Sequence, residues 1–239
     1  MTGVRGLTVL GIDTSGKTAS CAVLRDGILL GQRSVYTSLT HSQVILPFVE
    51  SLLDDVGLKL CDIDIIAVAD GPGSYTGLRI GISVVKGLCY DGKPCLGVST
   101  LEALAYNCAA AKARIIPVMS ARPGIVYFGA YDSDGESIAC AADDRVAPVG
   151  ELEAVADGYQ GDIILTGDAA QTVKDTLFAD NPSVRIAPVS QRLQQASGVC
   201  EAALRHLDMA GGAASLNARY LQVTKAEKDL FEKNSHSNS

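Results

Sequence analysis

The chain has 239 residues, of which 47% are hydrophobic, and its net charge is −7 at pH 7. A chain of this length and hydrophobicity can form a large core, in one or two domains, that needs no disulfides. Its negative charge argues against a basic nucleic-acid-binding face carried by this chain alone. The first residues hold no apolar signal-peptide core and the later apolar runs have strand length, so we predict no membrane span and a cytoplasmic location.

The first half of the chain predicts three strands followed by alternating helices and strands. Asp26-Gly27 is a typical two-residue hairpin turn between the second and third strands, and Ser99 with Glu102 forms a capping box. The predicted strands are 7–12, 20–25, 28–35, 65–69 and 94–98, and the predicted helices are 45–56, a glycine-bearing helix over 77–90, and 100–111.

The second half repeats the same order of elements. Its predicted strands are 114–119, 125–131, 137–141, 162–165 and 184–186, and its predicted helices are 149–156, 169–177 and 191–207. Both halves therefore follow the order βββαβαβα, which indicates a duplicated two-lobe α/β fold. We predict an N-terminal lobe over 1–112, a C-terminal lobe over 113–214, and a partly disordered C-terminal segment over 215–239, in which 217–221 is a candidate docked segment and 225–239 is polar and expected to fray.

Cysteine and histidine usage indicates a reduced protein without a metal cofactor. The seven cysteines are an odd number, form no Cys-x-x-Cys pair and lie mostly in apolar segments, which is typical of free core thiols in a cytosolic protein. The three histidines, His41, His206 and His236, are far apart, and none belongs to a His-Glu-x-x-His pattern. We therefore predict neither a metal site nor a cofactor.

The most informative segment is Asp70-Gly71-Pro72-Gly73-Ser74-Tyr75-Thr76-Gly77-Leu78-Arg79-Ile80-Gly81. Its Gly-Pro-Gly core predicts a sharp turn between a strand and a helix. Gly77 and Gly81 then share one helix face, where each glycine costs about 0.8 to 1 kcal/mol relative to alanine, so a close approach by a backbone or a phosphate is expected. The spacing matches neither a Walker A loop nor a dinucleotide fingerprint.

The glycine-bearing helix is apolar on two sides. One side is expected to face its own sheet, and the other faces either a second helix of the same lobe or a partner protein. The spacing leaves both interpretations open.

A second candidate site lies at the end of the first strand. A doubled βββαβαβα unit with an acidic residue there resembles the actin, sugar-kinase and Hsp70 superfamily, so Asp13, Thr14 and Ser15 are candidates for a vestigial nucleotide site. The matching turn of the second half, 120–124, holds no carboxylate. The loop 166–170 is rich in small residues and is a candidate adenosine-binding loop, but the cap of the next helix explains it equally well. A nucleotide-dependent phosphotransferase or ATPase is therefore the alternative function.

Several motifs together resemble the TsaB (YeaZ) family over nearly the whole chain. They are Gly11-Ile12-Asp13-Thr14-Ser15, His41-Ser42, the segment 71–81, Ser99-Thr100-Leu101-Glu102-Ala103-Leu104, Ala121-Arg122 with Val126-Tyr127, and Arg219-Tyr220-Leu221. The resemblance implies an ASKHA-type fold and a non-catalytic subunit that binds and activates the TsaD threonylcarbamoyltransferase in tRNA threonylcarbamoyladenosine synthesis. It further implies a TsaE-like ATPase as a second partner, tRNA contact only through the complex, a homodimer when the chain is alone, and no catalytic residue.

The resemblance also implies where the partner binds, because the family's partner surface is built from the first two helices of the N-terminal lobe. The matching residues here are Gly73, Ser74, Tyr75, Gly77, Leu78, Arg79, Gly81, Val84, Lys86 and Leu88. On this basis we predict that Gly77 and Gly81 lie at a helix–helix contact between two chains, with Arg79 and Lys86 beside it.

Three positions depart from the family pattern. Ser120 and Ile125 stand where the family usually has acidic residues, and Gln222 stands where it often has arginine. These departures weaken the inference that the turn around Ser120 contacts TsaE or a nucleotide. The peptidase label once given to the wider family has no matching metal ligands in this chain.

Overall fold

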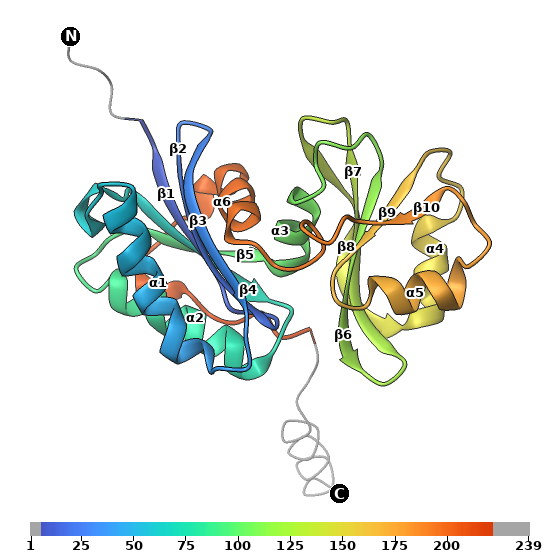
Figure 1. Ribbon diagram of the computed structural model, residues 1–239, viewed down its shortest axis with the longest axis horizontal. Coiled ribbons are helices and arrows are strands. Elements are labelled where there is room, and N and C mark those ends of the chain that lie inside the picture. The colour runs from blue at the N-terminus through green and yellow to red at the C-terminus, as the bar shows by residue number, and fades with distance from the viewer. Residues whose placement is uncertain (1–5, 222–239) are drawn as a thin grey trace, which may run out of the picture.

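A computed structural model of the chain describes residues 6–221 and shows two lobes side by side (Figure 1). The first lobe contains β1 (Thr8–Asp13), β2 (Thr18–Arg25), β3 (Ile28–Tyr36), α1 (His41–Asp55), β4 (Ile65–Gly71), α2 (Tyr75–Leu88), β5 (Cys95–Ser99) and α3 (Thr100–Tyr106). The second lobe contains β6 (Arg114–Arg122), β7 (Ile125–Ser133), β8 (Ile138–Pro148), α4 (Glu153–Ala156), β9 (Ile163–Thr166), α5 (Ala170–Leu177) and β10 (Val184–Ile186), and the same half of the chain ends with α6 (Ala196–Arg205).

The two sheets have the same topology. Their strand orders are β3-β2-β1-β4-β5 and β8-β7-β6-β9-β10, with the first three strands of each half antiparallel and the last two parallel to the first. Helices α1 and α2 cover the outer face of the first sheet, and α4 and α5 cover that of the second. The predicted two-lobe α/β fold from a duplicated unit is confirmed.

Helix α6 is shorter than predicted and begins at Ala196 instead of residue 191. The preceding segment, 191–195, forms a turn and bends instead of a helix because its carbonyl groups are bound from outside the helix. Gly167 N–H donates to the carbonyl of Arg192 (2.7 Å), and the Asn107 side chain donates to the carbonyl of Leu193 (3.0 Å). These tertiary hydrogen bonds replace the helical ones.

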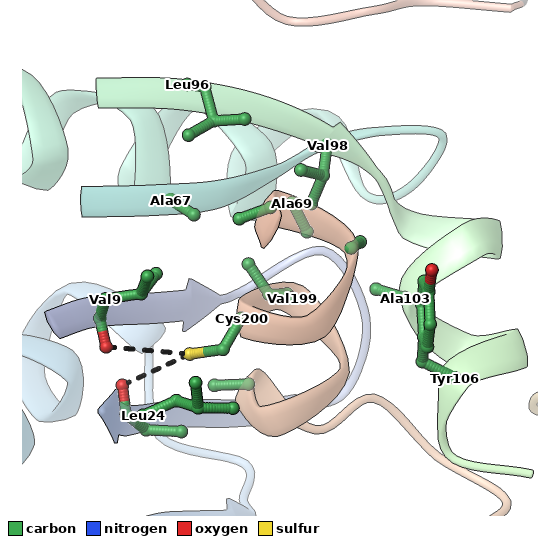
Figure 2. Close-up of a cluster of buried hydrophobic side chains, with 14 of the residues drawn as sticks. Val9, Leu24, Ala67, Ala69, Leu96, Val98, Ala103, Tyr106, Val199 and Cys200 are labelled. Atoms are coloured by element: carbon green, nitrogen blue, oxygen red, sulfur yellow. Dashed lines mark hydrogen bonds between the residues drawn. The ribbon is translucent and has the colours of Figure 1, made fainter. Parts of the chain in front are cut away.

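Helix α6 covers the sheet of the first lobe, although it comes from the second half of the chain (Figure 2). Cys200 lies fully buried between β1 and β2, with its Sγ 3.9 Å from the carbonyl oxygen of Val9. A Cβ at Gly11 would lie 2.5 Å from the carbonyl oxygen of Ala196, so only glycine permits this approach. A boundary at 112/113 therefore divides the chain into its two repeated halves, but it assigns α6 to the second half although α6 packs on the sheet of the first lobe.

Helix α3 makes the reciprocal contact with the second lobe. Leu101, Leu104 and Cys108 share a buried cluster with Ile115 and Met119. Gly198 lets α6 cross α3 closely, because a Cβ there would lie 2.1 Å from the carbonyl oxygen of Ala103. The two lobes are thus joined through the α3–α6 pair.

The C-terminal segment is docked as far as the described residues extend. Gly211 pairs with Cys95 through two backbone hydrogen bonds of 2.9 Å, and Leu216 is buried in the core beneath α1 and α2. The described part of this segment, 215–221, is therefore held against the first lobe, where docking of 217–221 was expected. Residues 222–239, with Gln222 and His236, lie outside the described residues.

All seven cysteines lie within residues 6–221 and are free. Five are buried, whereas Cys61 and Cys140 are exposed. Among residues 6–221, no helix is long and apolar enough to cross a membrane.

We expect an aromatic disulfide reagent to titrate two thiols in the native protein and seven after denaturation. Burial, together with Asp143 and Asp144, raises the pKa of the Cys140 thiol, so Cys140 should react more slowly than Cys61. The Cys61→Ser variant should lose the faster phase, and a third native thiol would contradict the packing of the core.

Candidate functional site

The glycine-rich turn between β4 and α2 packs against the turn that follows β1. Ser74 caps α2 by accepting a hydrogen bond from Gly77 N–H (3.3 Å), and its own N–H donates to the carbonyl of Ser15 (2.7 Å). A Cβ at Gly73 would lie 2.5 Å from that same carbonyl oxygen. The turn therefore needs glycine because two loops of one lobe meet there.

The glycine face of α2 is also occupied by its own lobe. A Cβ at Gly77 would lie 2.1 Å from the carbonyl oxygen of Thr14, and one at Gly81 would lie 2.5 Å from Thr14 Oγ1. Thr14 Oγ1 donates to the carbonyl of Gly77 (2.7 Å), and Leu78 is fully buried. The prediction that these glycines contact another chain is wrong, because the end of β1 fills the space that they leave.

The outer surface of α2 carries three of the predicted partner residues, Val84, Lys86 and Leu88. Ile80, Val84 and Leu88 are partly exposed and spaced four residues apart, so they form one apolar row, with Lys86 partly exposed beside them. Phe48 of α1 is also partly exposed and packs on the same cluster. We call Phe48, Ile80, Val84 and Leu88 the outer row.

The N-terminal end of α2 holds a cluster of aromatic and cationic side chains. The rings of Tyr75 and Tyr220 stack with centroids 5.2 Å apart, and Arg79 Cζ lies 4.2 Å from the Tyr75 centroid. Arg79 Nε donates to Tyr220 Oη (3.2 Å). The sequence gives no spacing signal for this cluster, since Tyr220 is far from α2 along the chain.

The structure places Asp13 inside the first lobe. Its Oδ1 accepts hydrogen bonds from Ser15 N–H (2.9 Å) and Ser15 Oγ (2.6 Å), and Ser15, not Asp13, lines the space between the lobes. His41 Nδ1 lies 3.1 Å from the carbonyl oxygen of Thr14. Burial raises the pKa of Asp13 to about 6, although the Ser15 donors and His41 oppose the shift.

We expect Asp13→Asn to stabilise the protein above pH 6 by about 1 to 3 kcal/mol, because the amide oxygen can accept both Ser15 hydrogen bonds without a buried charge. With a folded pKa of about 6 and an ordinary value of 3.8, the folded state binds more protons between these pH values. The wild type therefore loses stability as pH rises from about 4 to 6, and the variant lacks that loss. Urea unfolding at pH 4 to 7.5 measures the difference, and a constant difference across this range would contradict it.

A cleft of about 1380 Å³ separates the lobes. Its charged lining residues are Lys17, Arg122, Arg192 and Asp168. Asp168 Oδ1 accepts from Ser120 N–H (2.9 Å), so a carboxylate does reach the second-lobe turn, although from the loop 166–170. The helix-cap interpretation of this loop is wrong, because α5 begins after Ala169 without a side-chain cap.

Gly167 explains how Asp168 reaches that turn. Gly167 has a φ of +100°, and a Cβ there would lie 2.0 Å from the carbonyl oxygen of Val118. In the sequence, the glycine directly before Asp168 is the feature that could have predicted the close approach of this loop to Val118 of β6.

The described part of the chain, residues 6–221, holds no group of three or more His, Cys, Asp or Glu side chains placed to bind a metal ion. His206 Nε2 pairs with Glu102 (2.9 Å) instead. A hydrolytic metal centre therefore has no geometric support within these residues.

Two lobes with the same sheet topology, packed around an interlobe cleft, define a two-lobed actin-like α/β protein. The family model described as "TsaD: tRNA N6-adenosine threonylcarbamoyltransferase" matches residues 35–233. The structure of YeaZ from Pseudomonas aeruginosa superposes with a TM-score of 0.76 at 31% identity, and the match covers 90% of this chain and all of that chain. The chain belongs to the TsaB/YeaZ family.

Two curated relatives match this chain over a shorter length than the YeaZ structure does. The tRNA threonylcarbamoyladenosine biosynthesis protein TsaB of Bacillus subtilis is 41% identical over 52% of this chain and 55% of its own length. The protein of the same name from Escherichia coli is 36% identical over 55% of this chain and 58% of its own length. The chain thus spans somewhat more than half the length of these curated relatives.

Proposed function

We propose that this protein is a non-catalytic subunit of tRNA threonylcarbamoyladenosine biosynthesis that binds and activates a TsaD-like threonylcarbamoyltransferase. The observation that carries the proposal is the outer row, an apolar stripe left partly exposed in a chain of the TsaB/YeaZ family. Such a stripe is typical of a surface that another helix covers.

The two faces of α2 have different neighbours in this proposal, one in the same lobe and one in a partner chain. The face that carries Gly77 and Gly81 is filled by Thr14 of the same lobe, which leaves the outer row as the apolar surface that another chain can bury. A TsaD-like paralogue of similar fold is the proposed occupant, and a second copy of this chain takes its place when the protein is alone. A TsaE-like ATPase is the proposed third component.

The charge of the chain supports indirect contact with tRNA. A net charge of −7 is unfavourable for binding a polyanion. We therefore propose that the complex holds the tRNA and that this subunit acts in the cytoplasm through its partner.

The burial of Asp13 favours this function over phosphoryl transfer, because its carboxylate is bound to Ser15 and does not line the cleft. The alternative, an ATPase or phosphotransferase, rests on Lys17, Arg122, Arg192 and Asp168 in the cleft. An ATPase rate in the pure chain that is abolished by Asp168→Ala would support the alternative.

The test is Val84→Glu in a reconstituted modification assay with TsaD, TsaE, tRNA and threonylcarbamoyl-adenylate. We expect binding to TsaD to weaken at least about 100-fold, because burying an unpaired carboxylate at an interface costs about 3 kcal/mol or more, and modification should fall with it. Thr172→Glu adds the same charge to an exposed position of α5 and is the matched control. Wild-type binding by Val84→Glu would contradict the proposal, as would modification that is complete without this chain.

A further inference from the structure

The described end of the chain forms a strap, residues 211–221, across the first lobe. It starts at the backbone pairing of Gly211 with Cys95, passes through the core at Leu216, and reaches the glycine-rich turn at Arg219. Leu221 lines both the interlobe cleft and a second cavity of about 500 Å³. The strap therefore ends where the two lobes and the start of α2 meet.

Arg219 anchors the strap at the turn. Its N–H donates to the carbonyl of Asp70 (2.7 Å), and its guanidinium lies 3.4 Å from Asp70 Oδ2. A Cβ at Gly71 would lie 2.2 Å from the carbonyl oxygen of Arg219, so the strap can pass this close to the turn only because residue 71 is glycine. Asp70 is buried whereas the Arg219 side chain is exposed, so the backbone hydrogen bond to the Asp70 carbonyl is the firmer part of this anchor.

The next residue, Tyr220, holds two side chains of α2. Its ring stacks on Tyr75, and its hydroxyl accepts from Arg79 Nε while the Arg79 guanidinium lies over Tyr75. Arg79 is exposed, and within residues 6–221 it forms no ion pair with a carboxylate. An arginine fixed in this way loses little further entropy when it binds a carboxylate, and its planar fork suits that group.

We propose that the strap is a positioning element of the partner surface, in which Tyr220 holds Arg79 ready to pair with a carboxylate of the partner chain. The cluster adjoins the outer row on the same helix, so one partner can contact both. This inference rests on the proposed function, and it adds residues of the strap to the surface of the first two helices.

The test is calorimetric binding of the full chain to its TsaD-like partner at low and high salt. We expect Tyr220→Ala and Arg79→Ala each to weaken binding about tenfold at low salt and to reduce its salt dependence. The double variant should be little weaker than either single variant, because both changes remove one coupled contact. Arg219→Ala should act in the same direction, and Arg219→Lys should restore part of the loss.

Arg145→Ala is the matched control, because exposed Arg145 lies over the Phe128 ring (4.7 Å) on the other lobe. It should leave binding unchanged, and circular dichroism should show that all the variants fold. If Val84→Glu abolishes binding while Tyr220→Ala and Arg79→Ala leave affinity and salt dependence unchanged, the inference is wrong and the proposed function stands. If the wild-type chain does not bind the partner at all, the proposed function fails.

Discussion

Gly77→Ala is expected to destabilise the protein by about 3 kcal/mol, although alanine is the better helix former by about 1 kcal/mol. The added Cβ would lie 2.1 Å from the carbonyl oxygen of Thr14, and a backbone atom cannot move aside as the end of a side chain can. The hydrogen bond from Thr14 Oγ1 to the carbonyl of Gly77 would be lost in the same displacement. Urea unfolding at constant pH measures the change.

Gly87→Ala is the matched control, because Gly87 lies in the same helix and a Cβ there would meet no atom within 4 Å apart from its chain neighbours and the backbone of its own helix. This change should stabilise the protein by up to about 1 kcal/mol. Equal effects at the two positions, or a stable Gly77→Ala protein with weaker self-association, would restore the interpretation that the glycine face contacts another chain.

Residues 1–112 expressed alone are expected not to form a stable lobe. The sheet of the first lobe would lose α6, which supplies Ala196, Val199, Cys200, Ala202 and Ala203 to its buried cluster. The other face would lose Leu216 from the strap. The uncovered strand residues are apolar, so the fragment should aggregate or bind a hydrophobic dye.

The complementary fragment, residues 113–239, provides the control for this experiment. Mixing the two fragments during refolding should restore a cooperative unfolding transition, because α6 and the strap return to the first sheet. A soluble fragment 1–112 with a cooperative transition of its own would show that the first lobe folds without them.

The order of elements was predictable because hydrophobic period and turn residues are local signals. The strands, the Asp26-Gly27 hairpin and the Ser99 cap all depend on a few neighbouring residues, and the structure confirms them. The other half of the predicted capping box does not form, because the Glu102 carboxylate binds His206 Nε2 instead. The repetition of that order was sufficient to predict the duplicated fold.

The sites depended on distant contacts that the sequence could not specify. Spacing showed that Gly77 and Gly81 need a close neighbour but not that Thr14 supplies it. Likewise, the contacts of Asp168 with Ser120 and of Tyr220 with Tyr75 join residues far apart in the chain. The partner role of the outer row stays a prediction from family resemblance, as do the non-catalytic role, the TsaE-like partner and the homodimer.

The position of α6 has a consequence for how the protein is made. A ribosome releases the strands of the first sheet well before it adds residues 196–205, so one face of that sheet stays uncovered while the intervening second sheet is synthesised. Pairing of β1 with β4 can begin early, but final packing waits until α6 has emerged. Nascent chains of this protein are therefore expected to need chaperone protection until α6 can cover the sheet.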